Sequence, residues 1–356
     1  MNKLSKFALI TSLAMGTSFS FAQTQPTTNI DLAETGAIYT PAKVTFRPEV
    51  GFPTKARKGA LDAHITVRYD VDTSGKASNI HLVRTTGTKA YEALVLGNME
   101  DWEITPAMQN GTPVAQENQF YDFIYYTTRT SGRELAPTMR ANFQKAYRHL
   151  RGLLKDEKYE EFAEFADLLF QANISNFIET RQLWLLHNAY LNRTDGSIHD
   201  KIHSLEKALT GRPRTDKGTK LQTRIRANLF KLYVENAQYF DARFQFYQIQ
   251  ESEYGAELVQ ELGPMLDEVE SKLVSIEPLT ATVKIRENEI ARYILSRSSF
   301  SLSTSAPVKS SELRCDGFNV KFDYAENTTY TTPQDWGYCE LVVESEDKAE
   351  VTISEV

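Results

Sequence analysis

Residues 63–85 read AHITVRYDVDTSGKASNIHLVRT, and their pattern organises the N-terminal part of the chain. Up to Val71, apolar and polar side chains alternate, which is the period of a strand with one buried face. Residues 72–75 (DTSG) then supply side-chain acceptors and a glycine able to take positive φ. Apolar residues resume at Ile80. The sequence therefore predicts two strands joined by a tight turn.

The flanking segments extend this hairpin into a small domain. A Phe-Pro pair at 52–53 predicts a helical turn, because proline can start a helix but cannot lie in its interior. Residues 87–99 predict a second helix, and Trp102 is placed to cover the sheet. After an Asn-Gly turn at 110–111, residues 119–127 form a strongly aromatic last strand. Helix, strand, strand, helix, strand predicts helices on one face of an antiparallel sheet.

Residues 44–126 resemble the periplasmic C-terminal domain of TonB, the energy transducer of the bacterial outer membrane. The alternating strand, the Asp and Gly turn, Trp102 shortly before Pro106-Ala107, and the run NGTPV at 110–114 carry the resemblance. In that family the sheet edge pairs with an extended receptor peptide, which is β-augmentation. The resemblance implies a domain over residues 44–130 with a docking edge on its last strand. The implied contact residues are Phe120, Tyr121, Asp122, Phe123, Ile124, Tyr125 and Tyr126.

Two alternatives remain for this segment. Alternating aromatic residues in a strand commonly form core and cross-strand contacts, although they could also stack on a glycan. TonB itself also carries an inner-membrane helix and a long Pro-rich spacer before this domain, and this chain shows neither pattern. An accessory or adaptor role is therefore a better expectation than direct energy transduction.

The first residues predict export. Lys3 and Lys6 precede an apolar stretch that ends in small residues at Ser20 and Ala22, which is typical of a secretory signal peptide over residues 1–22. An uncleaved anchor is the alternative, but polar residues interrupt the stretch and it is short for a membrane span. Residues 23–43, rich in Thr, Gln and Asn, predict a tether. We expect a periplasmic protein with no membrane span after cleavage.

Composition limits the classes of partner. The 356 residues carry a net charge of −7 with 41% hydrophobic residues, which fits a globular chain of two or three domains. Nonspecific nucleic-acid binding requires clustered Lys and Arg to neutralise phosphates. The excess of acid argues against nucleic acid as a partner and favours proteins.

Residues 135–275 change to helical periodicity. Apolar residues recur at helical spacing, as in Phe143, Tyr147, Leu150 and Leu154. Paired helices of this kind predict an all-α solenoid. The unit at residues 229–246 has offsets similar to the tetratricopeptide pattern, and an irregular helical bundle is the alternative.

Residues 276–356 return to a period of two, which predicts a small all-β sandwich. Cys315 and Cys339 are the two cysteines of the chain. In an oxidising compartment they are expected to form one disulfide, worth about 3 kcal/mol in the chain-entropy description. The whole chain is thus expected to be α+β.

No catalytic constellation emerges from the sequence. Residues 70–75 imitate the start of a calcium loop, but its twelfth position holds His81 instead of an acid, so a plain turn is the better interpretation. His199 and His203 are spaced to chelate a metal, but a solvated helix face is favoured because a third ligand is not evident. We expect no cofactor and no metal.

Two functions follow from these patterns. The first is a non-enzymatic periplasmic adaptor, accessory to a TonB-dependent outer-membrane transport system, that binds partner strands by β-augmentation. The second is an envelope scaffold whose terminal sandwich binds cell-wall or outer-membrane components.

Overall fold

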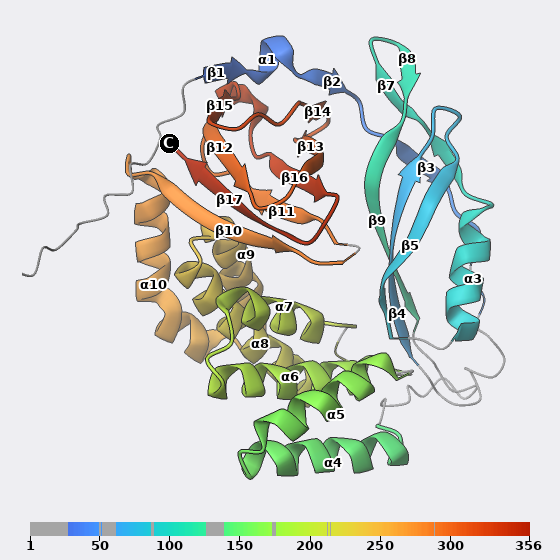
Figure 1. The fold of residues 1–356 in the computed structure, drawn as a ribbon, viewed down its shortest axis with the longest axis vertical. Coiled ribbons are helices and arrows are strands. Elements are labelled where there is room, and N and C mark those ends of the chain that lie inside the picture. The colour runs from blue at the N-terminus through green and yellow to red at the C-terminus, as the bar shows by residue number, and fades with distance from the viewer. Residues whose placement is uncertain are drawn as a thin grey trace, which may run out of the picture.

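The computed structural model describes residues 28–49, 51, 62–86, 89–125, 139–172, 176–211, 213, 215–287 and 289–356. Figure 1 shows an N-terminal module (residues 43–125), a helical region (139–274) and a β-sandwich built mainly from residues 279–356. This mixed architecture confirms the expected α+β class. The predicted signal peptide and the helical turn after residue 52 lie outside the described residues.

The N-terminal module is built on a three-stranded antiparallel sheet with the order β5-β4-β9. Its predicted hairpin, its helix after residue 87 and its aromatic last strand are all observed. Helix α3 covers one face of the sheet (Figure 1). The elements are β3 (Lys43–Phe46), β4 (Ala63–Val71), β5 (Ala77–Thr85), α3 (Lys89–Met99), β6 (Glu103–Thr105), β7 (Ala107–Gln109), β8 (Thr112–Val114) and β9 (Gln116–Tyr125).

The turn between β4 and β5 is built by one carboxylate and one glycine. Asp72 Oδ1 accepts hydrogen bonds from the backbone N–H groups of Ser74 and Lys76, at 2.8 and 2.9 Å, and from the Ser74 hydroxyl. The Ser74 hydroxyl and then the Lys76 N–H lower the pKa of Asp72. Gly75 has φ +83°, and a Cβ there would lie 2.1 Å from the carbonyl oxygen of Ile104. Residues 70–75 therefore have the geometry of a side-chain-capped turn.

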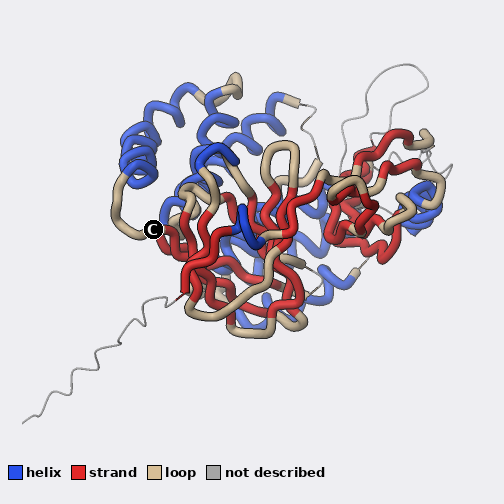
Figure 2. Tube along the Cα trace, turned by 90° about the horizontal axis from the view of Figure 1, so that it is seen from above, coloured by secondary structure: helices blue, strands red, loops and turns tan. Residues whose placement is uncertain are grey.

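Helices α4 to α10 follow one another below the sandwich in Figure 1, and Figure 2 shows the same arrangement from above. The amphipathic spacing seen in the sequence places Leu150, Phe162 and Leu183 in one buried cluster, and Leu229, Phe230 and Phe246 in another. The helices are α4 (Ala141–Lys155), α5 (Tyr159–Gln171), α6 (Phe177–Arg193), α7 (Ile198–Ala208), α8 (Asp216–Glu235), α9 (Tyr239–Gln250) and α10 (Ala256–Val274).

The turns after α4, α6 and α8 share one capping geometry. After α4, the N–H of Lys158 donates to the carbonyl of Leu153 at 2.9 Å, and Glu157 between them has φ 59°. This is a Schellman cap with an ordinary residue at the left-handed position that glycine prefers. The same bond joins Gly196 to Leu191 with Asp195 at φ 50°, and Gln238 to Tyr233 with Ala237 at φ 55°.

Replacing Glu157 with glycine is expected to raise the free energy of unfolding by about 0.5 to 1 kcal/mol. The left-handed conformation costs an L-residue about 1–2 kcal/mol, and the greater freedom of glycine in the unfolded chain offsets part of the gain. Urea denaturation measures the change. The neighbouring Asp156, with φ −86°, supplies the control, because Asp156→Gly is expected to give no gain. A loss of stability in both variants would contradict the strain argument.

The sandwich consists of two five-stranded sheets, ordered β1-β15-β12-β17-β10 and β11-β16-β13-β14-β2. The cysteines predicted to pair do so, because Cys315 and Cys339 form a disulfide with a Cα–Cα distance of 4.2 Å. The C-terminal strands are β10 (Leu279–Ile285), β11 (Ala291–Ile294), β12 (Ser299–Thr304), β13 (Val308–Arg314), β14 (Asn319–Lys321), β15 (Thr328–Thr331), β16 (Glu340–Ser345) and β17 (Ala349–Glu355).

The N-terminal end of the described chain belongs to the sandwich. Strand β1 (Thr28–Asp31) pairs in parallel with β15, and β2 (Ala37–Tyr39) pairs antiparallel with β14. Helix α1 (Leu32–Thr35) lies between them, and Leu32 is completely buried in the sandwich core. The tether prediction is therefore wrong for residues 28–39. Their short strands gain order from partners about 300 residues away, which local composition does not reveal.

Asp241, in the first turn of α9, lies where the helical region meets the sandwich. Burial, and then the charge of Glu206, raise the pKa of Asp241 to about 7. A raised carboxyl pKa disfavours the charged form in the folded protein, so stability falls as pH rises from about 4 to about 7.

Asp241→Asn is accordingly expected to raise the free energy of unfolding at pH 8 by at least about 1 kcal/mol, and to have no such effect at pH 4. Each unit of pKa shift corresponds to about 1.4 kcal/mol. Thermal unfolding at both pH values measures the change, with the exposed Asp267→Asn as control. An equal effect of Asp241→Asn at both pH values would contradict the assignment.

Candidate protein-interaction site

Strand β9 forms one edge of the module's sheet. It pairs with β4 from Tyr125, opposite Ala63, to Gln116, opposite Val71. Within the described residues, no strand pairs with its other side. In Figure 1, β9 lies on the side of the module that is nearest the sandwich. An edge of this kind offers unpaired N–H and C=O groups to a compatible strand.

The hydrogen bonds of β4 determine which residues of β9 pair inward. The N–H of His64 donates to the hydroxyl of Thr86, and the carbonyl of His64 accepts from the N–H of Thr86, so His64 bonds toward β5. Backbone direction alternates along a strand, so Ile65 bonds toward β9. The N–H and C=O groups of its partner Phe123 therefore form hydrogen bonds with β4.

The backbone N–H and C=O groups of the alternate residues of β9 therefore face away from β4. Phe120, Asp122 and Ile124 lie opposite residues of β4 that bond toward β5. Their N–H and C=O groups face the outer side of β9, where an added strand would bind.

Aromatic side chains of β9 pack inward, against α3 and against Trp102, which directly precedes β6. Tyr125 lies 4.8 Å from Tyr91 between ring centroids, and Trp102 lies 5.1 Å from Tyr121 and 5.8 Å from Phe123. These contacts have the offset and edge geometry of core packing. This geometry supports core and cross-strand packing for these three residues over glycan stacking. Tyr126 lies outside the described residues.

The opposite face of β9 contacts the helical region through a histidine. His64 Nδ1 accepts the N–H of Gly211 at 3.1 Å, and Nε2 lies 3.1 Å from the Asp122 carboxylate. The Thr66 hydroxyl also donates to Asp122. Burial raises the pKa of Asp122, but the His64 and Thr66 contacts and the charge of Arg84 outweigh it, so the net shift is downward. These contacts connect β9 to the helical region through His64.

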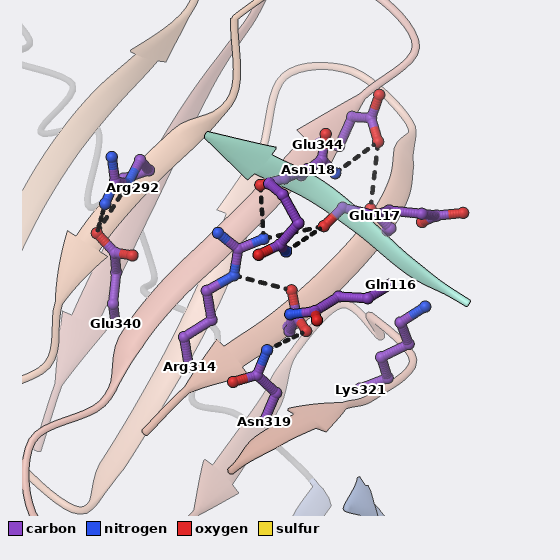
Figure 3. A network of polar contacts seen from close by, with 12 residues as sticks. Gln116, Glu117, Asn118, Arg292, Arg314, Asn319, Lys321, Glu340 and Glu344 are labelled. Atoms are coloured by element: carbon purple, nitrogen blue, oxygen red, sulfur yellow. Dashed lines mark hydrogen bonds and ion pairs between the residues drawn. The ribbon is translucent and has the colours of Figure 1, made fainter. Parts of the chain in front are cut away.

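The beginning of β9 is bound by the sandwich (Figure 3). Arg314 Nη2 donates to the carbonyls of Glu117 and Asn118, at 3.1 and 2.8 Å. The Asn118 amide donates to Glu344 at 3.0 Å, and Asn118 itself has φ 57° in a break of the β4–β9 register. The sandwich therefore binds residues 117–118, which directly precede the predicted docking edge. Within the described residues, Gln119–Tyr125 is the part of β9 without such hydrogen bonds to the sandwich.

These sandwich contacts have no local sequence signal. Arg314 and Asn118 are 196 residues apart, and each lies in an ordinary strand pattern. The network continues within the sandwich, where Arg314 Nε donates to Glu312 at 3.1 Å and Asn319 donates to the same carboxylate at 3.0 Å. No pattern in the sequence marked Arg314, so its role is visible only in three dimensions.

The two histidines considered for a metal do not lie on a solvated helix face. His203 packs edge-on to Trp184, with 5.4 Å between ring centroids, and its Nδ1 lies 3.8 Å from Glu289. Burial lowers the pKa of His203 to about 3 and also lowers the pKa of His199. Both side chains are partly buried and line a cavity between the three parts of the protein.

The N-terminal module matches a known protein family. A family model described as the Gram-negative bacterial TonB protein C-terminal matches residues 48–123. Residues 48–123 form a TonB C-terminal-like module. Among solved structures, one described as a molecular characterization of the TonB2 protein from Vibrio anguillarum is 20% identical, with a TM-score of 0.21. That match covers 35% of this chain and 100% of the other.

The match to the TonB-like module supports a protein-interaction role related to the TonB system. A comparison with curated proteins finds no match. The tetratricopeptide-like pattern of the helical region is not confirmed by the comparisons and stays a prediction. In the part of the chain that the structure describes, none of the helices combines the length and the apolar character that a membrane crossing requires.

Proposed function

We propose that this protein is a non-enzymatic periplasmic adaptor, accessory to a TonB-dependent outer-membrane transport system, and that β9 binds a partner strand by β-augmentation. The observation that carries the proposal is the outer side of Gln119–Tyr125, which has no strand partner within the described residues of a TonB-like module. Main-chain hydrogen bonds would give the affinity, and alternate side chains would give the selectivity.

The contacts around β9 support binding without a large rearrangement. Its inner side is fixed by β4 and its aromatic side chains are packed in the module core. Its polar face is held by His64 and Thr66 through Asp122. A rigid edge loses little conformational entropy when a strand is added, so more of the hydrogen-bond energy is available for affinity.

The mature protein tests this proposal directly. Peptides from the N-terminal plugs of outer-membrane receptors are titrated into residues 23–356 by calorimetry, with scrambled peptides as controls. We expect saturable binding of at least one plug peptide, and deletion of the gene should impair uptake of iron or a vitamin. Absence of binding to any plug peptide, together with normal uptake, would contradict the adaptor role.

One observation favours the envelope scaffold as a second candidate. Arg314 and Glu344 hold Glu117 and Asn118 at the start of the same edge, so part of the edge serves the protein's own architecture. If the scaffold role holds, deletion should change cell shape or wall integrity while uptake stays normal. Binding to isolated cell wall would then require the sandwich and not β9.

A further inference from the structure

Two adjoining cavities lie where the TonB-like module, the helical region and the sandwich meet. Their volumes are about 820 and 500 Å³, within the usual range for small-molecule sites. Both are lined by Arg84 of β5, His203 of α7 and Glu289, which follows β10. A ligand here would contact all three parts of the protein.

Arg84 differs from every other cation that lines the two cavities. Within the described residues, its guanidinium has no hydrogen bond and no carboxylate within 4 Å, and its Nε atom is buried. The other Lys and Arg side chains are all paired. The pairs are Lys207 with Glu289 at 2.7 Å, Arg286 with Asp200 at 2.8 Å, Lys284 with Asp200 at 3.9 Å, Lys348 with Glu287 at 3.7 Å and Arg292 with Glu340 at 2.7 Å.

The buried Nε donor of Arg84 is costly to leave without a partner, because it has lost water and gained no hydrogen bond in return. Burial lowers the pKa of Arg84, while the charges of Asp122, Glu206 and Glu289 raise it from a distance. A planar guanidinium with free donors binds a carboxylate in bidentate geometry. The cavity therefore supplies the cationic half of a carboxylate site.

The larger cavity is the better place for such an anion. Glu206 and Asp241 line only the smaller one and would repel it. Among the acids of the larger cavity, Asp167 alone has no cation within 4 Å in the described chain, and it is exposed to solvent.

An aromatic wall lies in the same larger cavity. Phe170 and Trp184 are partly exposed there, 4.4 Å apart between ring centroids, and His187 lies edge-on to Trp184 at 5.7 Å. Burial lowers the pKa values of His187 and His203, so both are neutral at pH 7 and add no charge. The wall can stack on a flat apolar group.

We propose that this cavity binds a small organic carboxylate that carries an aromatic ring, with Arg84 holding the carboxylate and Phe170 and Trp184 packing on the ring. The site is separate from the outer side of β9. A bound molecule would bridge β5 to α6 and α7, so it would also strengthen the attachment of the TonB-like module to the helical region.

Calorimetric titration of the mature chain with benzoate, acetate and inorganic phosphate tests the proposal. We expect saturable binding of benzoate, and binding of acetate and phosphate at least about tenfold weaker. Arg84→Gln should weaken benzoate binding at least about tenfold, the usual effect of removing a charge-assisted hydrogen-bond donor. Lys348→Gln, which removes a paired and mostly exposed cation from the same cavity, should change the affinity by less than about threefold.

Arg84→Lys provides a second variant should Arg84→Gln fail to fold, because it keeps the charge and loses the bidentate geometry. A several-fold weaker affinity for benzoate is expected. Benzoate affinity unchanged in a folded Arg84 variant would overturn the assignment of Arg84. Absence of benzoate binding to the unmodified chain, or phosphate binding as tight as benzoate binding, would overturn the proposed ligand class.

Discussion

Asp122→Pro is expected to weaken the binding of a receptor-plug peptide at least about tenfold, whereas Asp122→Ala is expected to leave it within about threefold. Asp122 lies opposite Thr66, and its N–H faces the outer side of β9. Proline removes that donor and fixes φ, which an edge strand tolerates when the lost N–H faces away from the sheet. An added strand would lose one of its main-chain hydrogen bonds and meet the proline ring.

The alanine variant makes the comparison a matched one. Both substitutions remove the carboxylate that contacts His64 and Thr66, so any loss of stability from those contacts is shared. Calorimetry gives the affinities, and thermal unfolding confirms that both variants are folded. Equal binding by the proline and alanine variants would argue against recognition through the outer main chain.

Phe123→Pro would test the folding of the module, whereas Asp122→Pro tests binding. Phe123 uses its N–H on β4 and its side chain is buried in the module core. Proline there breaks the ladder and leaves a cavity, so the variant is expected to unfold the TonB-like module rather than to report on binding.

Leu32→Ala is expected to lower the free energy of unfolding of the sandwich by about 2–5 kcal/mol, the usual cost for a buried leucine. Leu32 is completely buried, and it lies in the chain between β1 and β2, which are edge strands of the two sheets of the sandwich. A single domain commonly has only about 5–15 kcal/mol of net stability, so this is a large fraction. Urea denaturation of the mature chain measures it.

Ile38→Ala in β2 serves as the control. Ile38 is 39% exposed, so its truncation should cost no more than about 1 kcal/mol. A chain that begins at residue 40 should lose β1, α1 and β2 together and unfold more easily than either variant. Small effects from all three changes would mean that residues 28–39 act as a tether after all.

Local patterns explain what the sequence could predict. The β4–β5 hairpin, with Asp72 and Gly75 at its turn, is encoded within about 25 residues, and so is the aromatic last strand. The disulfide was predictable because the chain has two cysteines and a secretory pattern. Helix periodicity was strong enough to place the helical region.

Long-range pairing explains what the sequence could not predict. Residues 28–39 form only short elements, and β1 and β2 become strands because β15 and β14 offer them edges. Arg314 binds the start of β9, and Arg84 Nε is buried without a hydrogen-bond partner. Both features depend on how the module, the helical region and the sandwich pack together, which the separate sequence patterns do not predict. Alternation identified β9 as a strand, but only the register with β4 shows which of its residues face outward.

Hydrogen exchange at single amides of β9 tests the central claim most directly. In the free protein, the amides of Asp122 and Ile124 should exchange rapidly and those of Tyr121 and Phe123 slowly, because only the latter pair bond to β4. A saturating plug peptide should protect Asp122 and Ile124 and leave the other two unchanged. Slow exchange of Asp122 and Ile124 before any peptide is added, or no added protection with it, would contradict the account.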